Sequence, residues 1–166
     1  PTVRCGRPPV TLMRRASTAP DALALMSSEL EPVALVMRES LYEAGGEIED
    51  VDFPTTGCVS MIQTIDGGSV EVGTIGLEGF AGVPVLLRAT SEPTQSLVQV
   101  QGLGYRISAS AFRGVVADGR HMERIFLRYA MALFNKVAQS ATCTGMHHLQ
   151  DRCPAWLLIP HPSADA

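Results

Sequence analysis

Basic residues are the scarcer charged class in this chain, and long apolar runs are missing. The 166 residues include 13 Lys and Arg against 17 Asp and Glu, which gives a formal net charge of −4. This balance argues against a broad basic surface for nucleic acid, so we expect no DNA binding by the chain itself. No apolar run approaches the roughly 18 residues of a membrane span, so no membrane partner is expected. One domain is the default organisation at this length.

Paired cysteines are also missing. The four cysteines lie too far apart for Cys-x-x-Cys motifs: Cys5, Cys58, Cys143 and Cys153. We therefore predict reduced structural thiols and no metal site. His147 lies four residues after Cys143 and, with His148, offers haem or metal binding as an alternative, but we interpret both histidines as solvated. The N-terminus lacks the apolar segment of a secretory signal, which indicates a cytoplasmic protein.

What the sequence does contain is a series of short segments in which apolar and polar residues alternate. Two of them flank Asp66-Gly67-Gly68, a strong hairpin signal because type I′ turns need positive φ at both central residues. Further short strands are predicted at 96–102 and 103–108. About seven or eight short strands without helices between them favour an antiparallel sandwich, jelly roll or small barrel. We expect the sheet to close on itself.

Helical periodicity follows residue 108. Ser108 or Ser110 is predicted to cap a short helix over 111–116, and a long helix runs from near His121 to about Thr142. The long helix is apolar over most of its circumference, so it needs cover on two sides, of which the barrel provides one. We expect a homodimer through the other side, and a helix packed wholly within its own domain is the alternative. The predicted contact residues are Met122, Ile125, Phe126, Tyr129, Ala130, Leu133, Val137 and Ala141.

The segment GLEGFAGVP, residues 76–84, carries three glycines after an alternating run. Glycines allow backbone N–H groups to converge on an anion, but a phosphate cradle normally adds a cation or a helix N-terminus. The residues that follow are apolar, and the first basic side chain is Arg88. The loop therefore has the composition of a phosphate-binding bend without its charged partner.

The order of these elements, a short helix, a jelly roll with a glycine loop and a long apolar helix, resembles the effector domain of the Crp/Fnr family of bacterial transcription regulators. The resemblance runs from about Asp21 to Leu158 and rests on LYEAGGEIEDVDFPTTGCVSMI (41–62), GGSVEVGTIGLEGFAGVPVLL (67–87) and LRYAMALFNKVAQSATC (127–143). It implies a mainly β fold with flanking helices. This is an antiparallel jelly roll (double-stranded β-helix) of the cyclic nucleotide-binding type, followed by a long C-terminal dimerisation helix. We accordingly expect an irregular arm (1–19), a jelly-roll sensor domain (20–120), the dimerisation helix (121–145) and an irregular tail (146–166).

The resemblance also implies an effector site in the barrel. Its candidate residues are Gly79, Phe80, Ala81, Gly82, Val83, Arg88, Thr94, Gln95 and Ser96. In relatives that bind cyclic nucleotides, a Glu follows the glycine loop and an Arg-Ser pair holds the phosphate. Here those positions read Val83 and Thr94-Gln95-Ser96. A buried phosphate without a fixed cation is costly, so we expect no cofactor and no strong cyclic nucleotide binding, although Arg88 or Arg106 could substitute for the missing arginine.

Three functions remain open. The first is a non-enzymatic sensory and dimerisation domain of a Crp/Fnr-type regulator, with a small-molecule effector in the barrel. The second is a stand-alone interaction module, its pocket filled by Val83, Leu86 and Leu97, that heterodimerises with a full-length regulator. The third is a true cyclic nucleotide sensor. A jelly-roll metal enzyme needs histidines on its strands, and all four lie outside the predicted strands: His121, His147, His148 and His161.

The family continues past its long helix into a winged helix-turn-helix domain. Here the sequence reads HHLQDRCPAWLLIPHPSADA from residue 147, and Pro154 would break a continuing helix. We therefore expect the DNA-binding domain to be absent.

Overall fold

The computed structural model describes residues 26–66 and 68–146, with side chains as far as residue 141. After a helical turn at 26–29, its elements are β1 (Glu31–Leu35), β2 (Ser40–Tyr42), β3 (Asp50–Pro54), β4 (Cys58–Ile65), β5 (Gly68–Ile75), α3 (Val83–Leu86), β6 (Gln95–Val100), β7 (Gly102–Ser108), α4 (Ala109–Asp118) and α5 (Arg120–Met146). Several predictions lie outside the described residues: the arm, the side chains of the Cys143 and His147 pair, and the tail from 147 onward.

The seven strands of the described residues form two antiparallel sheets, ordered β1-β7-β3 and β2-β6-β4-β5. The predicted jelly-roll class is confirmed, but the expectation that the sheet closes on itself is wrong. The second edge of β3 meets a loop instead of a strand of the other sheet. Ala81 of this loop donates to the carbonyl of Asp52 at 2.8 Å and accepts from the Asp52 N–H at 3.3 Å.

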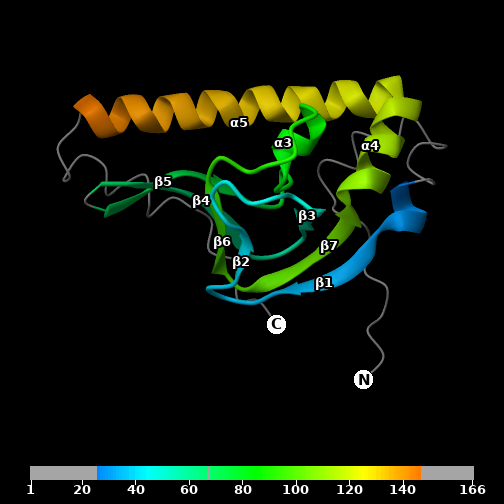
Figure 1. Cartoon of the computed structure of the whole chain (residues 1–166), viewed down its shortest axis with the longest axis horizontal. Coiled ribbons are helices and arrows are strands. Elements are labelled where there is room, and N and C mark those ends of the chain that lie inside the picture. Colours follow the sequence, from blue (N-terminus) through cyan, green and yellow to red (C-terminus); the bar gives the residue numbers. More distant parts are fainter. Residues whose placement is uncertain (1–25, 67, 147–166) are drawn as a thin grey trace.

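The core lies between the sheets and beneath α5. Its largest fully buried side chains include four phenylalanines, here called the aromatic cluster: Phe53 of β3, Phe80 before α3, Phe112 of α4 and Phe126 of α5. The ring centroid of Phe126 lies 5.1 Å from that of Phe112 and 5.4 Å from that of Phe80. These contacts hold both helices to the strands, and α5 lies along one side of the roll (Figure 1).

Strands β4 and β5 form the predicted hairpin. Ile65 pairs with Gly68, so two residues connect the strands, as in the tight turns that asparagine, aspartate and glycine favour. β6 accompanies β4 only from Cys58 to Ile62. Beyond that point the hairpin continues as a two-stranded arm (Figure 1).

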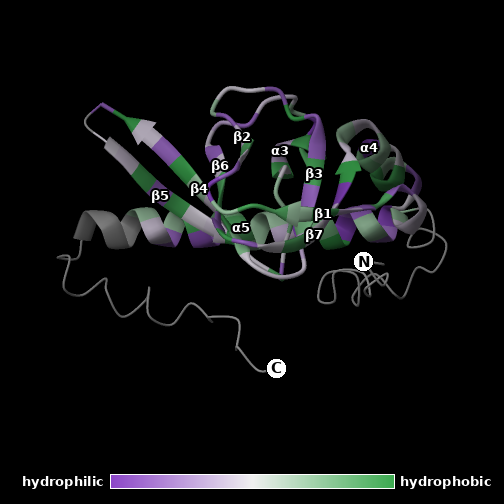
Figure 2. Ribbon diagram, turned by 90° about the horizontal axis from the view of Figure 1, so that it is seen from below, coloured by the Kyte–Doolittle hydropathy of each residue, from purple (hydrophilic) through white to green (hydrophobic). Residues whose placement is uncertain are grey.

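The helices begin where the sequence predicts. The Ser108 side-chain oxygen caps α4 by accepting a hydrogen bond from the N–H of Ala111 at 3.2 Å. α4 ends at Gly119, and α5 runs for 27 residues from the next position, which confirms the long helix. Hydrophobic and hydrophilic segments follow one another along α5 (Figure 2), as a helix with differing faces requires. None of the helices in the described part of the chain combines the length and apolar character of a membrane span.

Candidate functional site

The glycine loop, residues 76–82, connects β5 to α3 and lies against α5 and β3. A side chain at Gly79 would collide with the ring and hydroxyl of Tyr129 on α5, so only glycine permits this close approach. Gly82 precedes α3 with a φ of 93°, a left-handed conformation that favours glycine. A Cβ at Gly82 would lie 3.2 Å from the hydroxyl of Tyr42. The two glycines therefore let the loop rest on α5 at one point and on a group of polar side chains at another.

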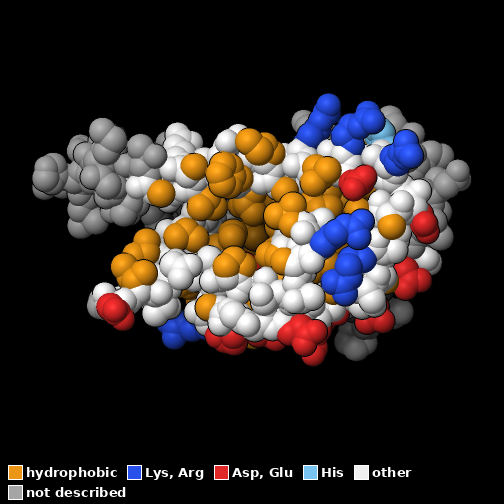
Figure 3. Space-filling view, turned by 45° about the horizontal axis from the view of Figure 1, so that its top comes forward, with side chains coloured by type: hydrophobic (Ala, Val, Ile, Leu, Met, Phe, Trp, Pro, Cys, Tyr) orange, Lys and Arg blue, Asp and Glu red, His pale blue; other side chains and the backbone are white. Residues whose placement is uncertain are grey.

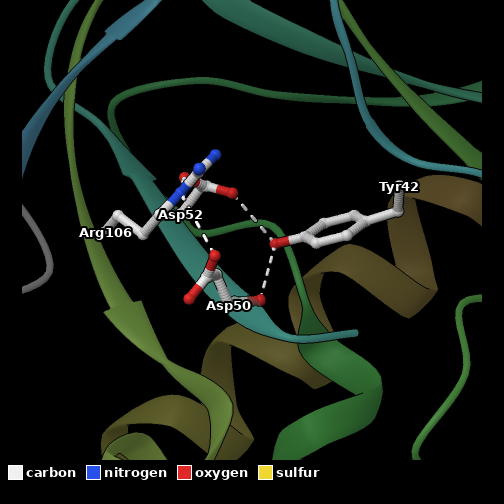
Figure 4. Close-up of polar contacts among 4 residues, drawn as sticks. All are labelled: Tyr42, Asp50, Asp52 and Arg106. Atoms are coloured by element: carbon white, nitrogen blue, oxygen red, sulfur yellow. Dashed lines mark hydrogen bonds and ion pairs between the residues drawn. The ribbon is translucent and has the colours of Figure 1, made fainter. Parts of the chain in front are cut away.

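That group, here called the polar cluster, joins three strands: Tyr42 from β2, Asp50 and Asp52 from β3, and Arg106 from β7 (Figure 4). The Asp52 carboxylate is 1% exposed and accepts a hydrogen bond from Nε of Arg106 at 2.8 Å. Asp50 lies farther from the same nitrogen, at 3.8 Å. The Tyr42 hydroxyl lies 3.1 Å from Oδ2 of Asp52 and 3.0 Å from the Asp50 carbonyl, so its one proton serves one of two acceptors.

The charged and polar groups of the polar cluster interact mainly with one another. Burial raises the pKa of Asp52, while the hydrogen bond and charge of Arg106 oppose that rise. Burial acts to lower the pKa of Arg106, but the hydrogen bond and charge of Asp52 outweigh it and the net shift is upward. Burial, with Asp52 in support, also raises the pKa of Tyr42 well above its ordinary value. The guanidinium thus neutralises a buried carboxylate rather than standing free.

A second buried acid lies in the segment before β6. Glu92 is 3% exposed, and its Oε1 accepts a hydrogen bond from the Thr94 hydroxyl at 3.1 Å. The backbone of Glu92 also hydrogen-bonds to that of Gly45 and Gly46. Burial raises the pKa of Glu92, and the Thr94 hydrogen bonds oppose it. Thr94, one of the residues where relatives carry an arginine and a serine, therefore has a carboxylate as its partner.

The structure brings together some of the predicted site residues and separates others. Gly79, Phe80, Ala81 and Gly82 are buried in the loop, Thr94 and Ser96 are buried where β6 begins, and Val83 and Gln95 are half-buried. Arg88 is exposed just after α3, at a φ of 64°, and has no ion pair within the described residues. The apolar residues Val83, Leu86 and Leu97 are each half-buried.

Sequence reasoning missed Tyr42, Asp52 and Glu92. Alternation along β3 puts Val51 and Phe53 on the core side, so Asp52 between them reads as a solvent-facing residue. In the structure Tyr42 and Arg106 cover that other side, and all three residues of the stretch are buried. Because this cover comes from distant strands, no local signal in the sequence identifies it.

The long helix turns several of its predicted contact residues inward. Met122, Phe126, Tyr129 and Leu133 are buried in the core of their own domain, and Ile125, Ala130 and Val137 are half-buried. Of the predicted set only Ala141 is exposed. The first four are thus already buried within their own domain, and the dimer contact through the predicted set stays a prediction. Helical periodicity shows that both sides are apolar but does not show which side the roll covers.

Different residues form the exposed apolar side of α5, here called the outer stripe: Leu127, Met131 and Phe134. Their side chains are 44%, 57% and 65% exposed, respectively. Hydrophobic side chains also gather over the face of the molecule that α5 borders (Figure 3). A helix of this kind has an apolar surface that the described residues of the chain do not cover.

The hydroxyl of Tyr129 is a buried polar atom without a hydrogen-bond partner among the described residues. Burial raises the pKa of Tyr129 above its ordinary value, the charge of Glu78 adds to the rise, and the backbone N–H of Phe80, which lies nearby without forming a hydrogen bond of good geometry, acts against it. The tyrosine thus sits at the contact between the glycine loop and α5 with one group unsatisfied. The described residues hold no group of three His, Cys, Asp or Glu side chains arranged to bind a metal ion.

Two facing antiparallel sheets, a glycine loop with a short helix after β5, and a long helix along the roll define the fold of a cyclic nucleotide-binding domain. No family model matches the sequence, and no curated protein does. Among solved structures, the chain is similar to CLP, the c-di-GMP-responsive global regulator of Xanthomonas campestris. The identity is 15% and the TM-score 0.71, over 89% of this chain and 75% of that one.

Two further structures share this architecture. A cyclic nucleotide-binding domain from Methylobacillus flagellatus is 15% identical, with a TM-score of 0.64 over 78% of this chain and 75% of that one. A CooA variant from Carboxydothermus hydrogenoformans is 10% identical, with a TM-score of 0.64 over 94% of this chain and 100% of that one. At such identities the similarity shows the fold, and the resemblance seen in the sequence is confirmed at that level.

Proposed function

We propose that this chain is the sensory and pairing domain of a Crp/Fnr-type transcription regulator, without enzymatic activity, whose effector loop does not bind a cyclic nucleotide tightly. The observation that carries this proposal is the engagement of Arg106 by the buried Asp52 at 2.8 Å, directly beside the backbone of the glycine loop. The shared fold of regulators such as CLP, described as c-di-GMP-responsive, supports a sensory role.

The charges around the loop disfavour a phosphate. Arg106 already shares its charge with the buried carboxylate of Asp52, which its Nε contacts at 2.8 Å, and with Asp50 at 3.8 Å, so it attracts a phosphate less strongly than an arginine without acidic neighbours would. Glu92 is a second buried acid, and its charge would repel a phosphate. Arg88 is exposed, so its charge is screened by water. The residues present therefore do not fit a cyclic phosphate, and a neutral effector suits the site better.

Calorimetry of the purified protein with cyclic AMP, cyclic GMP and cyclic di-GMP tests this part of the proposal. We expect no heat of binding from any of the three. Micromolar binding that disappears in Arg106→Gln, and persists in Arg88→Gln, would instead support the cyclic nucleotide sensor and would mean that Arg106 binds the phosphate despite its buried acidic neighbour. Binding lost only in Arg88→Gln would support the same sensor through the exposed arginine.

The pairing role rests on the outer stripe. Its three exposed apolar side chains lie along one side of α5, and a second copy of the chain packed there would remove them from water. In a complete regulator, an effector in the roll would change how two such helices pair. The interaction-module alternative uses the same stripe with a full-length relative in place of a second copy.

Sedimentation velocity distinguishes these arrangements. We expect a dimer that Met131→Glu converts to a monomer, since a buried charge opposes an apolar contact. Leu103→Glu is the matched control, because Leu103 of β7 is 58% exposed and lies off the helix. A parent protein that stays monomeric at all concentrations would contradict the homodimer and favour the heterodimeric module.

A further inference from the structure

Three arginines follow one another along the exposed side of α5 where the helix begins. Arg120, Arg124 and Arg128, here called the arginine crest, are four residues apart and all exposed. At about 100° per residue they fall within an arc of about 80° on the helix. None of the three forms an ion pair or side-chain hydrogen bond within the residues that the structure describes. Blue side chains gather over this end of the molecule in Figure 3.

The arginine crest is unfavourable for the helix that carries it. The N-terminal end of a helix has a partial positive charge, so cations in the first turns are destabilising. Like charges four residues apart repel one another as well. The only acidic residue in the first turn is Glu123, against Arg120 and Arg124. Because no ion pair within the described part of the chain compensates for these terms, the crest breaks a local rule of helix stability in the way that binding surfaces do.

Charge is unevenly distributed along the chain, and this distribution limits which kinds of anionic partner could bind the crest. Acidic residues outnumber basic ones several-fold between residues 29 and 92, whereas basic residues predominate between 106 and 136. A long polyanion such as nucleic acid would meet the acidic roll as well as the crest and would be repelled there. A short acidic segment meets the crest alone. Its best match is a helix with carboxylates four residues apart, because both rows then repeat every 6 Å or so.

We propose that the arginine crest binds an acidic helical segment of a partner protein. The crest adjoins the outer stripe on the same side of the helix: Arg128 directly follows Leu127, and the exposed apolar side chains continue from there toward the C-terminal end of α5. Contacts between exposed charges of this kind set the speed and the selectivity of encounter, and they weaken as salt screens them. The inference does not depend on the identity of any effector.

Fluorescence anisotropy with the whole chain tests the proposal. The probe is a labelled helical peptide with glutamate at every fourth position, compared with a peptide of the same composition in scrambled order and with a random-sequence DNA duplex. We expect the patterned peptide to bind at low salt, and Arg120→Gln/Arg124→Gln/Arg128→Gln to weaken it at least roughly tenfold. Arg38→Gln is the control, since Arg38 is an exposed arginine away from α5.

A second readout separates binding from folding. If the crest is retained at the expense of helix stability, the triple variant melts roughly 2–4 °C higher than the parent while it loses the peptide. Equal binding by the triple variant and the parent would overturn the proposal. So would equal binding of the scrambled peptide, tighter binding of the DNA duplex, or self-association of the protein at low salt that the triple variant abolishes.

Discussion

Phe126 and Phe134 lie two helical turns apart on α5 in opposite surroundings. Phe126 is 1% exposed within the aromatic cluster, whereas Phe134 is 65% exposed on the outer stripe. The inner side of the helix thus belongs to the folded core. The outer side has the same type of residue, but the described residues of the chain leave it exposed. The comparison teaches that the contribution of an apolar side chain on this helix to stability depends on how deeply it is buried. The residue type alone does not show this.

The largest expected effect separates these two phenylalanines directly. Phe126→Ala removes a fully buried ring and leaves a cavity among the other three, so we expect the free energy of unfolding to fall by about 3–5 kcal/mol. Phe134→Ala should change it by no more than about 0.5 kcal/mol in dilute protein. Urea denaturation of both variants measures the difference, and similar losses would show that the helix does not pack as described. A loss from Phe134→Ala that grows with protein concentration would report pairing.

The next effect comes from a substitution in the glycine loop, which contacts the buried side of α5. Gly79→Ala places a methyl group against the ring of Tyr129, and the strain should cost about 1–3 kcal/mol. In a Tyr129→Leu background the added cost should shrink, because the two positions are in contact. Gly114→Ala in α4 is the matched control: no atom lies near its added Cβ, so it should stabilise the helix by about 0.5–1 kcal/mol. Equal effects at both glycines would contradict the close approach of loop and helix.

A smaller effect concerns the unsatisfied atom on the inner side. Tyr129→Phe removes a buried hydroxyl that has no partner among the described residues, so stability at neutral pH should stay level or rise by up to about 1 kcal/mol. Burial raises the folded pKa of Tyr129. The unfolded chain therefore ionises first, so the stability of the parent is unaffected by this group below the unfolded value of about 10 and falls as the pH rises from there through the folded pKa. Thermal melts above pH 10 should accordingly show a smaller loss in the variant, and a larger loss would mean that a hydrogen-bond donor stabilises the ionised tyrosine in the folded protein.

The smallest effect lies at the boundary between the two sides. Lys136 donates a hydrogen bond to the Thr74 carbonyl at 2.7 Å and lies 3.8 Å from Glu78, but its side chain is 51% exposed. We expect Lys136→Gln to lower the free energy of unfolding by about 0.5 kcal/mol or less, since exposed pairs are well screened. A loss comparable to that of Phe126→Ala would mean that this edge, and not the aromatic cluster, holds the helix to β5.

Local signals predicted much of the fold. The Asp-Gly turn located the hairpin, Ser108 located the start of α4, and apolar periodicity located α5 to within a few residues. These features depend on residues that are close in sequence. Closure of the sheet depends on contacts between distant segments, and there the prediction was wrong. The inward side of α5 depends on such contacts as well, and helical periodicity did not predict it. Neither the pairing of Ala81 with Asp52 nor the cover over Phe126 has a local signature.

The candidate site divides in the same way. The sequence predicts the glycine loop from its three glycines, and it also shows that no arginine stands near Thr94. The sequence does not predict the polar cluster, because its members come from three strands and because the alternating pattern of β3 puts Asp52 on the side expected to face solvent. Arg106 was named as a substitute for the missing cation, but its geometry shows an arginine that already has a buried partner.

The order of the larger sheet, β2-β6-β4-β5, leaves β5 on its edge. β5 is eight residues long, while β2 on the opposite edge has three. A long outer edge can add a strand from another molecule, which is a route to aggregation. A bulge between Met61 and Ile62, the charged Glu71 and the hydrogen bond from Lys136 to Thr74 each interrupt the regularity such an addition requires. Protection of this edge against intermolecular pairing therefore depends on a few residues of the β4–β5 hairpin and on one lysine of α5.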